Sequence, residues 1–344
     1  MRSPLRAVLI LGVGAALLAL FLRNVDLRGV ASQIAHADPA WLALSLATMF
    51  VNLAVRAWRW QYLLEPLGHV RFGSSFRATS VGFAASNLLP LRAGEVVRPY
   101  FLSRIEQVSA AGAFATIILE RLLDMLTVLA MLAMYILFFT PPMSGANRAE
   151  FEAVKVTGLV AAAASVIALV VMVVVAGNPD RLTKAVAWID RFLPARLAGL
   201  LEGLAAKFVV GLGAVRKPGR LLVAFALSVP LWLSIAGGIW AGAVAFHLDI
   251  PFTGAFLIIA PLVVGVAVPT PGGVGGFHAA FRYATTTFFN APDEAAVGAA
   301  IVVHLFTVVP TLLLGLIFAA QEGLNVAGMR TIASHAGTEG TDAP

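Results

Sequence analysis

The stretch "SNLLPLRAGEVVRPYFLSR", residues 86–104, places three arginines and one glutamate inside an otherwise apolar chain. A second stretch, "VAVPTPGGVGGFHAAFRYATT" at 266–286, repeats its proline and glycine punctuation. Each stretch interrupts an apolar region, about 75–106 and about 252–289, near the middle of that region. The arms on either side hold about 15 residues, or about 22 Å of helix, which is short for a bilayer core of about 30 Å. We therefore expect both regions to form re-entrant helical hairpins.

The composition identifies the environment of the chain. Hydrophobic residues make up 60% of the 344 positions and charged residues only 12%, whereas soluble domains carry about 25% charged residues. The mean hydropathy is +0.89. Apolar runs of spanning length predict six transmembrane helices, at about 5–22, 40–58, 111–139, 154–176, 221–246 and 297–320. The fold class predicted is an all-α polytopic membrane protein.

Charge bias predicts the orientation of the chain. The linker at about 178–220 carries eight basic residues against three acidic ones, and cytoplasmic loops of membrane proteins collect Lys and Arg. Counting crossings from this linker puts both chain termini in the cytoplasm. Apolar residues recur at helical spacing in the linker, at Leu182, Val186, Ile189 and Leu193, and predict an amphipathic helix in the membrane interface; a solvated connector is the alternative. The tail at 323–344 is polar and predicted to be disordered.

The same count predicts an inverted repeat. The first unit, about 40–139, and the second, about 221–320, each consist of a crossing, a hairpin and a second crossing. The first hairpin enters from the cytoplasm and the second from outside, so the two units have opposite orientations. Many secondary transporters are built from such repeats and handle substrate between them.

Ionisable residues gather in the first unit. Arg92, Glu95 and Arg98 follow one another at spacings of three, which places them on one helical face. The next helix contains "ILERLLDML", with Glu120, Arg121 and Asp124 at a depth of roughly 14 to 20 Å. Charged groups at that depth usually face the protein interior and pair with each other. They mark either a functional site or a structural ion-pair network, and the two roles are compatible. The motif "RAWRWQY" at 56–62 is typical of an interfacial aromatic and arginine anchor.

The second unit carries glycines and histidines instead. In "PTPGGVGG" the glycines free successive amides, which could bind an anion, or they merely permit a tight turn. His278 and His304 could carry protons near neutral pH, although a lone histidine on an apolar face is more often a core residue. A metal site would need a third ligand, and the sequence offers none nearby. With no cysteine and no Walker, zinc or dinucleotide motif, we expect no cofactor, no metal and no nucleic-acid partner.

The motifs "NLLPLRAGEVVRPYFL", "ERLLD" and "PTPGGVGG" together resemble the transmembrane domain of lysylphosphatidylglycerol synthases, the flippase-like family. The resemblance covers about 5–322, within a predicted transmembrane domain at 1–322, and implies movement of a polar lipid between leaflets. Family members usually carry a glutamate where Phe277 and His278 stand, and often an arginine near His304. The substrate-binding candidates are Asn87, Pro90, Arg92, Gly94, Glu95, Arg98, Glu120, Arg121, Asp124, Pro269, Pro271, Gly272, Gly273, Gly275, His278 and His304.

The expected function is therefore translocation, without catalysis, of an anionic or phosphate-bearing lipid across the inner membrane. Two alternatives remain open at the level of sequence. One is a membrane transferase acting on a lipid-linked sugar or amino acid, with Glu95 or Asp124 as general base. The other is a non-transporting partner in cell-envelope lipid synthesis.

Overall fold

A computed structural model describes residues 25–89, 92–139, 146–177, 217–268 and 270–335, together with single residues at positions 12, 19, 21, 22, 210 and 213. The described residues form helices and no strand. Most of the predicted first helix and of the 178–220 linker lies outside the described residues, and so do Pro90 and Pro269.

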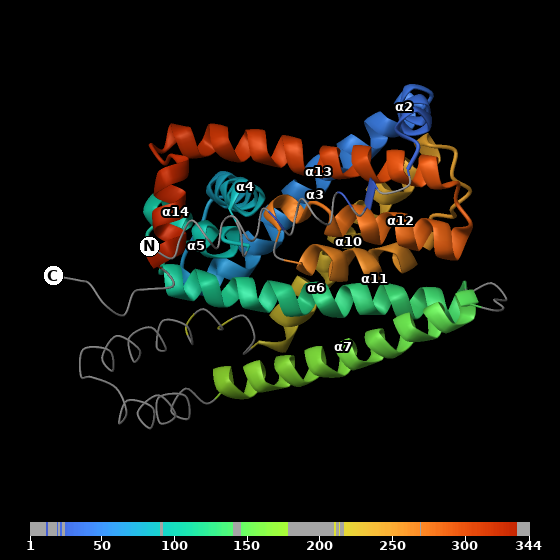
Figure 1. Ribbon diagram of the computed structural model, residues 1–344. Helices are drawn as coiled ribbons and strands as arrows, with labels where there is room; N and C mark the ends of the chain where they lie inside the picture. The colour runs from blue at the N-terminus through green and yellow to red at the C-terminus, as the bar shows by residue number, and fades with distance from the viewer. Residues whose placement is uncertain are drawn as a thin grey trace.

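Eleven α-helices and two short 3₁₀ segments make up the described ranges (Figure 1). They are α2 (Leu27–Ala35), α3 (Pro39–Leu64), η1 (Glu65–Leu67), α4 (Phe72–Leu88), α5 (Gly94–Ile105), α6 (Ala110–Phe138), α7 (Ala146–Gly177), α10 (Pro218–Ala245), α11 (Gly254–Ala267), η3 (Pro271–Gly273), α12 (Gly276–Phe289), α13 (Asp293–Gln321) and α14 (Val326–His335).

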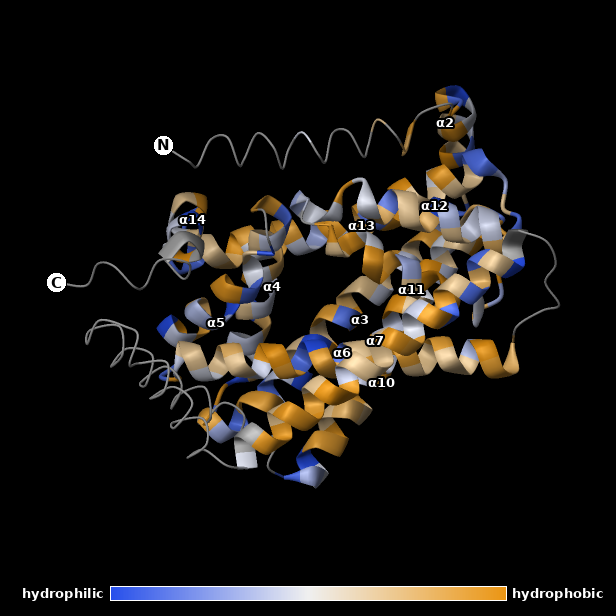
Figure 2. Cartoon of the chain, turned by 60° about the horizontal axis from the view of Figure 1, so that its bottom comes forward, coloured by the Kyte–Doolittle hydropathy of each residue, from blue (hydrophilic) through white to orange (hydrophobic). Residues whose placement is uncertain are grey.

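Five segments in the described ranges are long and apolar enough to cross a membrane. They are Pro39–Leu67, Ala110–Phe138, Arg148–Val174, Pro218–Ala245 and Asp293–Gln321. Each coincides with one of the six predicted crossings; the sixth, at about 5–22, falls mostly outside the described residues. Hydrophobic residues make up much of these long helices (Figure 2), as expected for helices that cross a membrane.

Local signals in the sequence fix where the crossings begin. Asp38 precedes α3, where its carboxylate accepts hydrogen bonds from the amides of Ala40 and Trp41. Ser109 precedes α6, and its hydroxyl accepts from the amide of Gly112. Such N-cap side chains satisfy amides that have no partner within the helix.

The two predicted hairpin regions each form a pair of short helices. The first pair, α4 and α5, has 17 and 12 residues, and the second, α11 and α12, has 14 and 14. In each pair the backbones touch at two glycines: a Cβ on Gly94 would collide with the carbonyl of Gly82, and one on Gly276 with that of Gly265. Only glycine permits this close approach. The pairs lie toward opposite ends of the long helices (Figure 1).

The contacts among helices repeat between the two halves of the chain. The first helices of the two halves, α3 and α10, pack on each other. Helix α4 of the first pair packs on α13, and its counterpart α11 packs on α6. Helix α5 contacts α6, just as α12 contacts α13. The two halves are thus interlocked, and each pair of short helices packs against the last long helix of the other half.

The turns of the two pairs meet inside the protein. Arg92, in the turn between α4 and α5, donates a hydrogen bond of 3.1 Å to the carbonyl of Val266 near the end of α11. Asn87 donates to the carbonyl of Val308 at 3.4 Å and to the hydroxyl of Thr311 at 3.1 Å, both on α13. The backbone of Arg92 has a φ of 52°, which is uncommon for a residue other than glycine.

The chain after the last crossing differs from the prediction of a disordered tail. Residues Val326–His335 form α14, which contacts α5. Leu324 and Met329 are buried in the apolar cluster around Trp60 and Phe101, and this burial stabilises the helix there. The remainder of the predicted tail, after residue 335, lies outside the described residues.

Candidate functional site

The centre of the site is an arginine, Arg59, that the sequence analysis did not select. It lies on α3 with its side chain fully buried. One terminal nitrogen donates to Asp124 at 2.7 Å and to the hydroxyl of Ser228 at 2.6 Å, while the other donates to Glu120 at 2.9 Å. Glu120 and Asp124 are one helical turn apart on α6, so both can face α3. Arg59 joins α3, α6 and α10.

Arg98 binds the same carboxylate from the other side. Its Nη1 donates to the second oxygen of Glu120 at 2.8 Å. Its guanidinium lies 3.7 Å from the centre of the Trp60 ring, in the geometry of a cation–π contact. Trp60 is held by a hydrogen bond of 2.9 Å from its indole nitrogen to Thr116. The expectation that the charged residues of this unit pair with each other is therefore met by Arg98 and Glu120.

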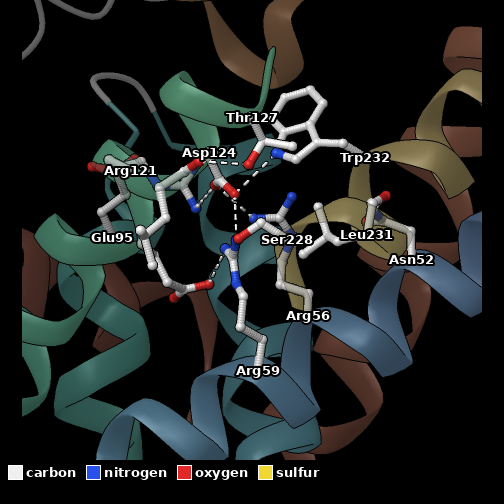
Figure 3. Close-up of polar contacts among 12 residues, drawn as sticks. Asn52, Arg56, Arg59, Glu95, Arg121, Asp124, Thr127, Ser228, Leu231 and Trp232 are labelled. Atoms are coloured by element: carbon white, nitrogen blue, oxygen red, sulfur yellow. Dashed lines mark hydrogen bonds and ion pairs between the residues drawn. The ribbon is translucent and has the colours of Figure 1, made fainter. Parts of the chain in front are cut away.

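Asp124 is surrounded by donors (Figure 3). Its Oδ1 accepts from Arg59 and, at 3.1 Å, from the indole of Trp232 on α10. Its Oδ2 lies 3.3 Å from Arg56 and 3.5 Å from Arg121. Three of these contacts are hydrogen bonds and the contact with Arg121 is an ion pair, so three of the about four lone-pair positions of the carboxylate are used within the protein.

A looser, partly exposed set of charges continues from the buried network. Arg121 lies 3.9 Å from Glu95, and Glu95 lies 4.0 Å from Arg92. The side chains of Arg121 and Glu95 are 39% and 36% exposed. These distances describe ion pairs without hydrogen bonds, so Arg92, Glu95 and Arg121 can rearrange more easily than Arg59 can.

The interpretation of "RAWRWQY" as an interfacial anchor is wrong for most of its residues. Arg56, Arg59 and Trp60 are buried, and only Trp58 is largely exposed. The missed signal was the charge on α6: two carboxylates one turn apart at membrane depth require cationic partners. Arg56 and Arg59, three residues apart on the preceding crossing, were available to pair with them.

The glycine-rich turn fits the tight-turn alternative. Gly272, Gly273 and Gly275 have positive φ values of 62°, 71° and 84°, a conformation that disfavours residues with a Cβ. The amide of Gly273 donates to the carbonyl of Thr270, and the amide of Gly275 donates to Nδ1 of His278 at 3.3 Å. These amides are already engaged, so the turn offers an anion fewer free donors than the sequence suggests.

The two histidines are neighbours in the structure. The ring centres of His278 and His304 lie 4.5 Å apart in an edge-on arrangement. Nε2 of His304 lies 2.8 Å from the carbonyl of Gly272 and must donate to it, whereas Nδ1 of His278 accepts from Gly275. The acceptor role at Nδ1 requires the neutral form of His278. The pair holds the glycine-rich turn against α12 and α13.

A cavity of about 380 Å³ lies between the two halves of the chain, a volume within the range of small-molecule sites. Nine predicted residues line it: Asn87, Arg92, Gly94, Glu95, Arg98, Arg121, Gly272, Gly273 and His304. Glu120 and Asp124 lie behind the lining arginines, and Pro271, Gly275 and His278 are not in the lining.

Several lining residues were not predicted as site residues. On α3 they form a polar stripe of Ser45, Thr48, Asn52 and Arg56, one helical turn apart. Helix α10 adds Trp232 and Ser234, and α13 adds Thr307 and Thr311. Single hydroxyl and amide residues in a crossing carry little signal by themselves. Their periodic spacing along α3 was the available indication.

Comparison with known proteins places this geometry in a family context. The glycosyltransferase AglD of Haloferax volcanii is 24% identical to the chain over 328 residues, which cover 88% of the chain and 52% of that protein. A UPF0104 membrane protein of Methanocaldococcus jannaschii is 25% identical over 103 residues, 29% of the chain and 31% of that protein. One of Methanothermobacter thermautotrophicus is 28% identical over 122 residues, 35% of the chain and 36% of that protein. The chain thus matches about half of AglD and about a third of the other two.

Residues 7–315 match the family described as the lysylphosphatidylglycerol synthase transmembrane region. This match covers most of the chain, including every helix that lines the cavity except the last turns of α13. The chain therefore belongs to the family of the lysylphosphatidylglycerol synthase transmembrane region.

Proposed function

We propose that the protein moves a polar lipid with an anionic headgroup across the bilayer, without chemical change to the lipid. The observation that carries this proposal is the cavity between the two halves, which combines four arginines with hydroxyl and amide groups. Asp124, beside the cavity, is the fifteenth residue of the 29-residue α6, about 21 Å from its start. The polar groups therefore lie near the middle of a crossing, where a lipid headgroup meets its highest barrier.

The cavity would lower that barrier by solvating the headgroup. A charged side chain at the centre of a bilayer costs about 3 kcal/mol or more, and a lipid headgroup faces the same desolvation. Arginines and hydroxyls in the cavity replace lost water contacts while the acyl chains stay in the lipid. Arg92 holds the two halves together through Val266, so opening toward either side requires a change at this contact.

The proposal includes a topology. We place the protein in the inner membrane as six crossings and two re-entrant hairpins, arranged as an inverted repeat with both termini in the cytoplasm. The interlocked contacts of the two halves and the opposite positions of the short helix pairs (Figure 1) support this arrangement, and so does the excess of basic residues at 178–220.

A second candidate is a membrane transferase, because one relative is named a glycosyltransferase. The matched part is about half of that protein, so its activity does not transfer to this chain by similarity alone. Asp124 is a poor candidate for general base because three donors hydrogen-bond to its oxygens and Arg121 forms an ion pair with it. Glu95, partly exposed in the cavity, is the carboxylate that this alternative requires. A third candidate is a non-transporting partner in lipid synthesis, which the experiment below distinguishes from the other two.

Reconstitution into liposomes tests the proposal. The full chain is inserted into vesicles that contain an acyl-labelled phosphatidate, and an impermeant quencher is added outside. Translocation makes inner-leaflet label accessible to the quencher, and extraction of the lipid shows whether it has been modified. We expect exchange without a new product. A product in place of exchange would favour the transferase. The absence of both exchange and product would favour the non-transporting partner.

A matched pair of variants ties exchange to the cavity. Thr307→Trp fills the cavity from α13, whereas Leu313→Trp adds the same side chain to an exposed position on the same helix. We expect Thr307→Trp to abolish exchange and Leu313→Trp to retain it, with both proteins folded by size-exclusion chromatography. Equal exchange by both variants would show that lipid does not pass through this cavity.

A further inference from the structure

The charges at the cavity do not balance. Five arginines belong to the connected set: Arg56, Arg59, Arg92, Arg98 and Arg121. Three carboxylates oppose them: Glu95, Glu120 and Asp124. The set therefore carries two positive charges in excess. His304, the remaining titratable residue in the cavity lining, shares its Nε2 proton with the carbonyl of Gly272 and supplies no negative charge.

The excess is accompanied by buried donors that lack acceptors. Nε and Nη2 of Arg98, Nε of Arg56 and Nε of Arg121 are buried and have no hydrogen-bond partner among the described residues. Arg98 and Arg56 are 5% and 6% exposed and line the cavity. Buried polar groups in native proteins nearly always have partners, so these nitrogens point to an acceptor supplied by a ligand.

The second half of the cavity cannot supply the missing negative charge. Its lining residues on α10, α11 and α13 carry apolar, hydroxyl, indole or imidazole side chains or are glycine, and none of them is a carboxylate. The counter-charge must then come from whatever enters the cavity. An excess of two charges matches a ligand with two negative charges better than a ligand with one, because an unpaired buried charge is strongly unfavourable.

We propose that the cavity selects a lipid headgroup with two negative charges, the chemistry of a phosphate monoester or a diphosphate. Singly charged phosphodiester headgroups and zwitterionic or cationic headgroups would leave arginine charge uncompensated. Arginine suits this role because its planar fork binds phosphate oxygens in pairs. The inference rests on the proposed function for the idea that the ligand is a lipid, and it adds the charge class of the headgroup.

Binding to the purified full chain tests the charge class separately from transport. Thermal unfolding in detergent is measured at pH 8, where a phosphate monoester is doubly charged because its second proton leaves near pH 6. The probes are phosphatidate, phosphatidylglycerol, phosphatidylethanolamine and soluble pyrophosphate. A ligand that binds only the folded state raises the unfolding temperature, and at a fixed ligand concentration the rise grows with the logarithm of its affinity. We expect phosphatidate to bind about tenfold more tightly than phosphatidylglycerol, since one more buried charge pair is formed.

Two variants at partly exposed positions change the charge without removing the buried network. Arg121→Gln lowers the excess to one charge and should reduce the preference for phosphatidate over phosphatidylglycerol about tenfold. Glu95→Gln raises the excess to three and should increase that preference. Arg77→Gln removes an arginine that pairs with Glu322 outside the cavity and should leave the preference unchanged.

Each outcome separates this inference from the proposed function. Equal affinity for phosphatidate and phosphatidylglycerol, or no effect of Arg121→Gln on their ratio, would overturn the charge class even if lipid exchange is observed. Selective binding of phosphatidate without exchange would support the charge class and contradict transport. A shift with pyrophosphate but with no lipid would show a site for a free anion and overturn the lipid headgroup.

Discussion

The two pairs of short helices share their packing and differ in their chemistry. In both pairs the helices touch through glycines, and both turns reach the centre of the protein. Around the first turn, arginines and carboxylates form a connected network with an excess of positive charge. Around the second, glycines and two histidines form neutral hydrogen bonds.

This difference separates architecture from ligand recognition. Backbone that leaves the helical conformation inside a membrane must be covered by protein, and both turns meet that condition through glycine contacts. Recognition of an anion needs charge as well, and only the first half provides it. Under the proposed function, the cavity lining of the second half would be the uncharged wall against which a bound headgroup is held. The comparison leads to four predictions.

The largest expected effect is on labelling from the two sides of the membrane. Because the chain contains no cysteine, single cysteines can be introduced without a background. We expect Arg71→Cys and Gln107→Cys, which flank the first pair, to react with an impermeant maleimide only from the cytoplasm. Asp249→Cys and Pro292→Cys, which flank the second pair, should react only from outside. A pair divided between the two sides would show that its helices cross the membrane, and the inverted repeat would be wrong.

The next effect concerns the buried charges. Glu120→Gln removes the carboxylate shared by Arg59 and Arg98 while retaining its shape. Loss of one partner of a buried ion pair costs about 3 to 5 kcal/mol, so we expect a large fall in unfolding temperature and in the yield of folded protein. Glu322→Gln, which removes the surface partner of Arg77, should cost less than about 1 kcal/mol. Similar stability of the two variants would mean that the network contributes little to folding.

Replacing a contacting glycine by alanine should destabilise the protein equally in the two halves. Gly94→Ala and Gly276→Ala each place a methyl group against a facing carbonyl, and overpacking of this kind costs about 1 to 3 kcal/mol or more. Gly73→Ala on α4 and Gly219→Ala on α10 meet no atom within 4 Å and serve as controls. Thermal unfolding of the four variants measures the effect. A large loss of stability in one half alone would show that the two glycine contacts are not equivalent.

The smallest effect is expected at the histidines. His304→Phe removes the donor to the carbonyl of Gly272 and should destabilise the protein by about 1 kcal/mol. His304→Gln, whose amide can still donate, should recover part of that loss. Both changes can be followed by thermal unfolding. A loss as large as that of Glu120→Gln would indicate that the second half holds a charge interaction of its own.

Much of the architecture could be predicted from the sequence, because it follows from length and composition. Five crossings, two interrupted regions and the contact between Arg98 and Glu120 agree with expectations drawn from apolar runs and helical spacing. The rotation of each helix about its axis could not be predicted in the same way. It depends on packing between helices distant in the chain. The pattern around Arg59 therefore predicts an interfacial anchor, although the side chain is fully buried.

Hydrogen bonding by the backbone is the second feature that could not be predicted from the sequence. The sequence shows that glycines free the amides after Pro271, but it cannot show that those amides already have acceptors. In the structure the amide of Gly275 is bound to His278. Likewise, α14 depends on burial of Met329, a contact with distant residues that no local pattern in a polar segment predicts.

Helix α7 has a consequence for the origin of the fold. It lies between the two halves in sequence, exposes most of its apolar residues and packs mainly on α6. Each half, as proposed, crosses the bilayer an even number of times, so two copies joined directly would point the same way. One additional crossing between the copies makes the second copy enter the membrane from the opposite side, and α7 provides that crossing. An ancestral duplication could therefore give antiparallel copies through a helix that mainly supplies length and apolarity. Exchange of α7 for an apolar helix that retains Glu150, Phe151 and Met172, which contact the rest of the protein, should preserve the arrangement of the core.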